Sequence, residues 1–490
     1  MDPVRGHDAR RRRFLRDTLS YLPSSLIPAA VSVASVSLFT RLFSPHFYGL
    51  YGLVTAGTAI AIPLLGEWAA QPAARYYAEY QAHGEIGVFS AAVGAMASLI
   101  LYAAALVALL AAGVSLVLYH AIWHPWLLAG ALLVVGTHAL ATVITPILPA
   151  SFQAGAYNQI RVVSSVLALG VQLALIAVLG RDVAWILWGS GAVSAATLPW
   201  MMRRAGIRLA WRPRVDTAAV QAAVGRFWRY GGPMGLWFLS STLLYSADRF
   251  VINGFIGASA VGIYTVNYNL VARLMGLIKS PVNNASFPVL MQQWARRELQ
   301  AARETLAAMT TLYLELGVGL VGLMVVVAGY VVDIVLGAPF RVGYEVMVPV
   351  LAGVVVWGAS NLGHKTLEFV ENTRLMMVDG FLAAGVNIGL NLWLVPRYGY
   401  VAAAYVTLAT YLFYTVLIWF QVRSVLPWDI QWKPLAWSGA AALLAIVACA
   451  RLVWPHPGSP WTNLMWGVGL FGVPYGLMVF GPRYVRGRGA

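Results

Sequence analysis

Three basic side chains, Arg249, Arg273 and Lys279, fall inside apolar runs that are long enough to cross a membrane. A charge at bilayer depth costs at least about 2.5–3.5 kcal/mol on the insertion scale, so such a group faces the protein interior or a wet cavity. The planar guanidinium of Arg273 suits a diphosphate, which it can bind through two parallel hydrogen bonds. Lys279 offers a point charge that either contacts the same anion or extends to the lipid headgroups. We therefore expect an anion-binding site around Arg273, with Asn269 one helical turn before it on the same face.

Arg249 ends a polar series in which Ser241 and Tyr245 precede it at intervals of four residues. That spacing places the three side chains on one helical face, so Tyr245 and Arg249 are further candidates for substrate binding. An arginine at the membrane surface and a salt bridge to another part of the chain fit the position of Arg249 equally well. Adjacent side chains on a helix point to different faces, so we do not expect Asp248 to pair with Arg249.

Four carboxylates inside apolar runs are candidates for ion coupling: Glu67, Glu315, Asp379 and Asp248. A buried carboxylate can carry a proton because desolvation favours its neutral form. Each of the four could equally be one half of a static pair.

The predicted eighth span carries a polar stripe with steps of three and four residues. A stripe at that spacing occupies one face of a continuous helix, and lipid would not tolerate it. We expect this face to line a polar interior. Its members are Gly262, Thr265, Asn269, Arg273, Gly276, Ser280 and Asn284.

Motifs for catalysis are missing from the sequence. Cys449 is the one cysteine, the eight histidines have no metal-ligand spacing, and no P-loop, nucleophile elbow or zinc signature occurs. A membrane polysaccharide polymerase or glycosyltransferase, the main alternative from another class, would need a sizeable outer loop with catalytic groups, whereas the predicted outer turns are short. We therefore expect no enzyme activity, no catalytic residues, no metal and no cofactor.

These residues must be positioned by membrane-spanning helices. Hydrophobic residues make up 60% of the 490 and charged residues 10%, against about 45–50% and about 25% in soluble domains. A span needs about 20 apolar residues, and the chain supplies about fourteen such runs, so we predict an all-α polytopic membrane protein. The runs are 18–40, 47–66, two within 86–160, 162–180, 183–202, 230–253, 259–289, 306–336, 346–364, 375–396, 400–421, 435–454 and 462–480.

The distribution of positive charge predicts the orientation of these spans. Outside the spans, Lys and Arg fall on the side of the N-terminus except at five outer positions, and cytoplasmic loops are the ones that retain positive charge. Both termini are therefore predicted to be cytoplasmic, and the net charge of +15 reflects this bias and contact with anionic membrane lipids rather than nucleic-acid binding. The outer positions are Arg41, Arg181, Arg341, Arg397 and Arg451.

The chain also contains an internal repeat. A shift of 213 positions superposes Arg13 and Phe14 on Arg226 and Phe227, and the same shift superposes Gly49 on Gly262 and Tyr51 on Tyr264. Each half begins on the same side and has an even number of spans, so the halves are parallel. We predict an N-terminal six-helix lobe at 1–202, a basic cytoplasmic linker at 203–229, a second six-helix lobe at 230–424, and two additional helices with a cytoplasmic tail at 425–490.

Two stretches carry a family resemblance. Residues 248–252 (DRFVI) with 257–264 (GASAVGIY) resemble the junction between the seventh and eighth spans of bacterial polysaccharide flippases of the Wzx type. Residues 387–391 (NIGLN) with 395–399 (VPRYG) are similar to the eleventh span of the same family. That family belongs to the MOP superfamily, with the lipid II flippases and the MATE drug exporters, and the resemblance extends over essentially the whole chain.

The resemblance implies a MATE-like fold with two lobes around a central cavity, located in the bacterial cytoplasmic membrane. It also implies alternating access, by which an undecaprenyl-diphosphate-linked oligosaccharide moves from the inner to the outer leaflet. A lipid II flippase or a MATE-type exporter is the alternative within the superfamily. The implied partners are the lipid-linked glycan, membrane lipids, and a polysaccharide polymerase and glycosyltransferases.

Overall fold

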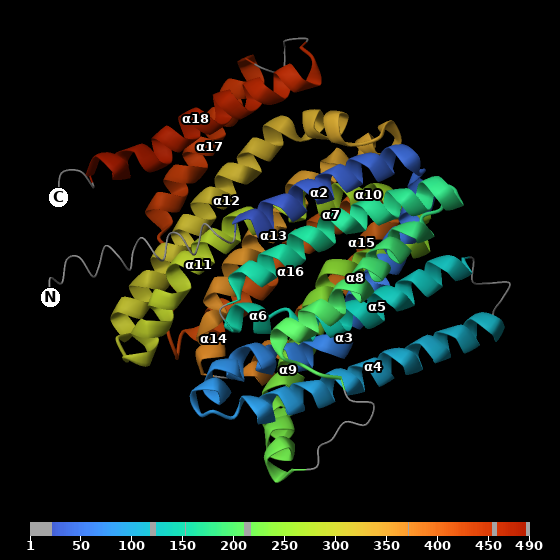
Figure 1. The fold of residues 1–490 in the computed structure, drawn as a ribbon. Coiled ribbons are helices and arrows are strands. Elements are labelled where there is room, and N and C mark those ends of the chain that lie inside the picture. Colours follow the sequence, from blue (N-terminus) through green and yellow to red (C-terminus); the bar gives the residue numbers. More distant parts are fainter. Residues whose placement is uncertain are drawn as a thin grey trace. The chain divides into compact units, whose positions relative to one another are not determined.

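The computed structural model describes residues 22–117, 124–151, 153–209, 217–370, 372–452 and 458–486, and within these it is helical throughout, without a β-strand. Every element labelled in Figure 1 is a helix. Some side chains within the helices, including those of Lys279, Ser280 and Asn284, lie outside the described part. The all-α prediction is confirmed.

The described helices follow one another with short connections. In order they are α2 (Leu22–Leu42), α3 (Pro45–Ala82), α4 (Ile86–Val117), α5 (Pro125–Ile144), α6 (Ile147–Ala150), α7 (Ala154–Leu179), α8 (Ala184–Ala205), α9 (Ala218–Phe255), α10 (Ala258–Ala272), α11 (Leu274–Ala295), α12 (Leu299–Val335), the 3₁₀-helix η1 (Ala338–Val346), α13 (Met347–Gly363), α14 (Lys365–Phe369), α15 (Thr373–Tyr398), α16 (Tyr400–Val422), α17 (Trp432–Leu452) and α18 (Pro460–Arg486).

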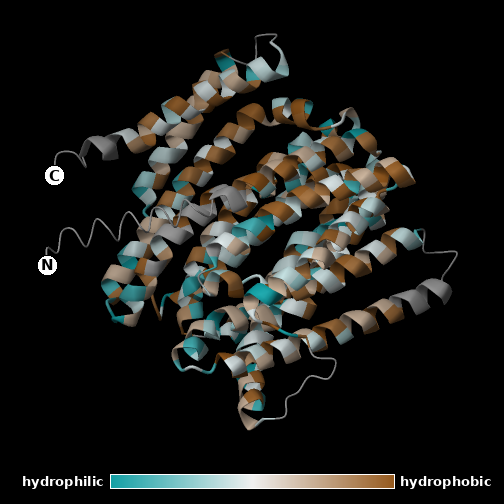
Figure 2. Ribbon diagram, in the orientation of Figure 1, coloured by the Kyte–Doolittle hydropathy of each residue, from teal (hydrophilic) through white to brown (hydrophobic). Residues whose placement is uncertain are grey.

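Ten helical stretches within the described residues are long and apolar enough to cross a membrane. They comprise α3, α4, α5 with α6, α7, α12, η1 with α13 and α14, α15, α16, α17 and α18. Figure 2 shows hydrophobic residues along most of their length. A helix satisfies its own backbone hydrogen bonds, which is what an environment without water requires. The protein is therefore a multi-pass membrane protein, while the count of fourteen spans stays a prediction.

The chain divides into two compact units. Unit 1 consists of the chain up to Ser35 together with Leu53–Ser246, and unit 2 consists of Val36–Gly52 together with the chain from Ala247 onward. The crossing points thus lie inside α2, α3 and α9. The predicted lobe boundaries at residues 202 and 230 stay a prediction.

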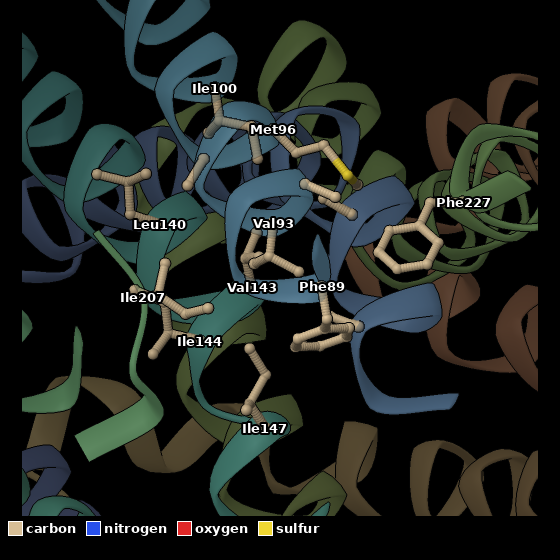
Figure 3. Packing of buried hydrophobic residues seen from close by; sticks show 14 of the residues in the cluster. Phe89, Val93, Met96, Ile100, Leu140, Val143, Ile144, Ile147, Ile207 and Phe227 are labelled. Carbon is tan, nitrogen blue, oxygen red and sulfur yellow. The ribbon is translucent and has the colours of Figure 1, made fainter. Parts of the chain in front are cut away.

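Unit 1 has a closely packed apolar core contributed by α3, α4, α5, α8 and α9. Phe89, Val93 and Met96 of α4 pack with Val143 of α5 and with Phe227 of α9 (Figure 3). Phe227 is fully buried, so the start of α9 is part of this core. In unit 2, α12 packs against α13, α17 and α18, and α13 packs against α16.

Within unit 2, the segment Val36–Gly52 contacts the end of α12. The guanidinium of Arg41 donates to the carbonyl oxygens of Ile334 and Val335, both at 2.9 Å. These are among the last carbonyls of α12, which have no partner within their own helix. The backbone N–H of Gly337 also donates to Thr40 Oγ1 at 3.1 Å. The end of α2 therefore caps the C-terminus of α12.

The start of α3 approaches α10 closely at two glycines. A Cβ added to Gly49 would overlap the carbonyl oxygen of Ala258, and one added to Gly262 would overlap that of Pro45. The contact is reciprocal: the same shift of 213 positions that superposes Gly49 on Gly262 also superposes Pro45 on Ala258. Segments related by a twofold repeat would meet in this way.

Candidate functional site

Arg273 lies where the predicted eighth span is broken. α10 ends at Ala272 and α11 begins at Leu274, with Arg273 forming the junction. The backbone N–H of Gly276 donates to the Arg273 carbonyl at 3.2 Å, a bond between residues three apart that is tighter than an α-helical turn. The prediction of one continuous helix was wrong at this point. Arg273 keeps right-handed helical dihedral angles, so the interruption is local and α11 continues directly from α10.

The Arg273 side chain is exposed, and no carboxylate among the described residues forms an ion pair with it. Its charge acts on the phenol groups of Tyr48 and Tyr51, which come from the start of α3. Tyr48 is buried at 4% exposure, and Tyr51 is half-buried. The exposed guanidinium of Arg273 is thus a group of hydrogen-bond donors that fits an oxyanion, and its charge reaches the phenols at the start of α3.

The polar stripe of the eighth span does not form one open face. Gly262 and Thr265 are buried, and they lie against Gly49 and Gly52 of α3. These small residues serve the close approach of two helices rather than a polar cavity. Asn269 is half-buried, Arg273 and Gly276 are exposed, and the side chains of Lys279, Ser280 and Asn284 lie outside the described part.

Arg249 and Asp248 form a buried ion pair. Arg249 Nη1 lies 3.1 Å from Asp248 Oδ1, and the two side chains are 3% and 0% exposed. The expectation that these neighbours would not pair was wrong, and the reason is local. Asp248 Oδ1 also accepts from the backbone N–H of Arg249 at 2.8 Å, so the short carboxylate is folded onto the backbone within reach of the long arginine side chain.

This ion pair belongs to a larger polar cluster between α9 and α10. Tyr264 donates to Asp248 Oδ2 at 2.5 Å, and Arg249 Nη2 lies 3.5 Å from Asn269 Oδ1. The Arg249 guanidinium also lies over the Tyr268 ring at 4.9 Å. A charge with this many buried partners is held in place. Tyr245, one turn earlier on α9, is half-buried.

The other three candidate carboxylates lie in separate places. Glu67 of α3 accepts from Gln71 Nε2 at 2.8 Å. Glu315 of α12 is 1% exposed, and Tyr475 of α18 donates to its backbone carbonyl at 2.5 Å.

Asp379 of α15 is 2% exposed and accepts from Gln421 Nε2 of α16 at 2.7 Å. Among the described residues, no group of three or more His, Cys, Asp or Glu is placed to hold a metal ion.

Comparisons with known proteins give a matching family and similar solved structures. A family model described as "Polysaccharide biosynthesis protein" matches residues 14–294. A search of curated protein sequences finds no significant match.

Among solved structures, the lipid II flippase MurJ in an inward closed conformation is similar, with a TM-score of 0.68 and 14% identity, covering 95% of this chain and 98% of that one. Inward-facing and outward-facing conformations of a multidrug resistance MATE family transporter of the MOP superfamily are also similar. Their TM-scores are 0.61 and 0.57, at 14% and 13% identity, covering 81% and 84% of this chain and 94% of each of those. At these identities the likeness shows the fold alone.

Proposed function

The chain belongs to the polysaccharide biosynthesis protein family, and from that membership we propose that it is a flippase for a lipid-linked oligosaccharide. The proposed substrate is an undecaprenyl-diphosphate-linked glycan, moved from the inner to the outer leaflet of the bacterial cytoplasmic membrane by alternating access. A polysaccharide polymerase and glycosyltransferases are the proposed partners. Both chain termini are proposed to be cytoplasmic, and the protein is proposed not to be an enzyme.

The observation that carries the proposal is the exposed guanidinium of Arg273 at the junction of α10 and α11. The span predicted from the sequence begins at residue 259, so at a rise of 1.5 Å per residue Arg273 is expected about 21 Å along it, within a hydrocarbon core of about 30 Å. An exposed charge at that depth is costly unless it has an anionic ligand or water. A diphosphate matches the forked donors of an arginine.

The same observation favours an anionic lipid over a cationic drug. The half-buried Tyr51 offers a phenol group on which the charge of Arg273 acts, while Tyr48, which the same charge influences, is buried. Lys279, Asn269 and Tyr245 are proposed as further substrate contacts, while the buried pair with Asp248 supports a positioning role for Arg249. Lipid II also carries a diphosphate, so it is the second candidate substrate. The likeness of this chain to the lipid II flippase MurJ is the reason to test it.

Replacing Arg273 in the producing bacterium tests the proposal. Arg273→Ala removes charge-assisted hydrogen bonds worth about 1.5–3 kcal/mol each, so the loss of one such bond alone corresponds to a loss of about 10- to 150-fold in diphosphate binding. We expect loss of surface polysaccharide at an unchanged level of protein in the membrane, with partial activity in Arg273→Lys. Arg397→Ala is the matched control, because that exposed arginine lies in the last turn of α15 and donates to the Trp393 carbonyl of its own helix.

The outcomes separate the candidates. Normal surface polymer in Arg273→Ala would overturn the proposed role of this residue. Restored growth of cells depleted of their own lipid II flippase, with no effect on surface polymer, would favour lipid II as the substrate. Resistance to cationic drugs that depends on this chain would favour an exporter.

A further inference from the structure

The start of α15 and the end of α16 carry a buried acid–amide pair in unit 2. Asp379 is 2% exposed, and its Oδ1 accepts a hydrogen bond of 2.7 Å from Gln421 Nε2. Asp379 is in the second turn of α15, which begins at Thr373, and Gln421 is the last residue but one of α16. The pair therefore lies about 9 Å along α15 from its first residue.

Two oxygen atoms of this pair have no donor. Asp379 Oδ2 and Gln421 Oε1 are both buried, and no donor in the described part of the chain reaches either atom. An ionised carboxylate and an amide carbonyl can only accept hydrogen bonds. Each buried polar atom left without a partner costs about 1–3 kcal/mol, and a charged one costs more. Turning the Gln421 amide over would not help, because its carbonyl would then face Asp379 Oδ1.

A single proton supplies what both atoms lack. A protonated carboxyl group is a donor as well as an acceptor, and a carboxylic acid and an amide can join through two hydrogen bonds. One of these two bonds is already present, from Gln421 Nε2 to Asp379 Oδ1. We propose that Asp379 and Gln421 form a proton-binding site in unit 2. In this site Asp379 Oδ2 binds one proton, and the resulting O–H group donates a hydrogen bond to Gln421 Oε1.

The charged groups nearby do not replace this proton. His364, at the end of α13, acts on Asp379 electrostatically, but its Nδ1 lies 3.8 Å from the Glu368 carboxylate. Lys365 Nζ of α14 lies 2.7 Å from Glu368 as well, so the lysine on this side pairs with Glu368. No ion pair to Asp379 is present among the described residues.

A metal cation fits the site less well than a proton. Hard cations take about six or more oxygen ligands, whereas the site offers the two oxygens of one carboxylate and one amide. The Glu67–Gln71 pair of unit 1 is a similar acid–amide pair, in which Gln71 Nε2 donates to the Glu67 carboxylate at 2.8 Å. It differs from the Asp379 site because Glu67 is half-buried and neither of its oxygens is buried without a partner.

The proposal goes beyond the proposed function, because binding of a proton needs no transported lipid. The test is infrared difference spectroscopy of the full chain reconstituted in liposomes, recorded without substrate. At about pH 6.5, roughly two units above the ordinary pKa of exposed carboxylates, a carbonyl stretch of a protonated carboxyl group should be visible. It should disappear at higher pH and in Asp379→Asn. Asp333→Asn is the matched control, since that carboxylate is 42% exposed and lies 3.3 Å from Arg341.

Gln421→Met provides a second readout that does not depend on the stability of Asp379→Asn. It keeps the length of the side chain but removes both hydrogen-bonding groups, so the carboxyl band should persist and shift to the frequency of an acid without that bond. An unchanged spectrum in both variants would overturn the proposal. A band that sodium chloride removes, while choline chloride at equal concentration does not, would also overturn it in favour of a cation site.

Discussion

Replacing Gly49 with alanine tests the close approach of α3 to α10 in unit 2. An added Cβ would overlap the Ala258 carbonyl oxygen and lie 2.6 Å from its carbon, where ordinary contacts are 3.4–4 Å. The two helices would have to separate by about 1.5 Å, since backbone atoms cannot rotate away as a side chain does. Overpacking of this kind costs about 1–3 kcal/mol, which reduces the population of the closed contact about 5- to 150-fold.

The reciprocal geometry makes the prediction sharper. Gly262→Ala meets the Pro45 carbonyl across the same contact, so the separation forced by one substitution also makes room for the other. We therefore expect the double variant to cost less than the sum of the two single variants.

The assay is thermal unfolding of the purified full chain in detergent micelles. Gly57→Ala is the matched control on α3, because a Cβ there meets nothing within 4 Å. That substitution should stabilise the protein by about 0.4–1 kcal/mol, since alanine restricts the unfolded chain. If Gly49→Ala is as stable as Gly57→Ala, or if the two contact variants are additive, the reciprocal contact does not exist in the folded protein.

Two further substitutions test the ion pairs. Arg249→Met should destabilise the protein by about 3–5 kcal/mol because it leaves Asp248 charged and buried, and adding Asp248→Asn should recover part of this loss; unfolding at the wild-type temperature would contradict the buried pair. Arg226→Gln breaks the hydrogen bonds of 2.6 and 2.9 Å from Arg226 to Glu79. Both side chains are about 40% exposed, so the free energy of unfolding should fall by less than about 1 kcal/mol, and by less still with added salt. A fall of several kcal/mol in the same unfolding assay would refute this.

The helices were predictable because their signal is local. An apolar run of membrane-spanning length leaves the backbone only its own hydrogen bonds, so the predicted run at 400–421 matches α16 to within one residue, and the run at 462–480 lies within α18. Where polar residues continue a helix beyond the membrane, hydropathy gives no boundary. The run predicted at 47–66 therefore belongs to a helix that continues to Ala82.

The site was predictable only in part because its contacts are tertiary. The cost of burying charge singled out Arg273 and Asp379, but nothing near Arg273 in sequence indicates that its charge acts on Tyr48 and Tyr51. The internal repeat was the one available signal, since it relates Tyr51 to Tyr264, nine residues before Arg273. The break at Arg273 has no glycine or proline at the junction to mark it.

The position of Phe227 has a consequence for producing this protein in pieces. A cut after residue 209 would fall within the linker predicted at 203–229. It would nevertheless leave Val220, Ala223 and Phe227, which belong to the unit 1 core, on the second fragment. The first fragment alone would expose the apolar surface of Phe89 and Val93 that α9 covers (Figure 3). Two fragments cut there must be made together in one cell, because each holds part of what the other needs to fold.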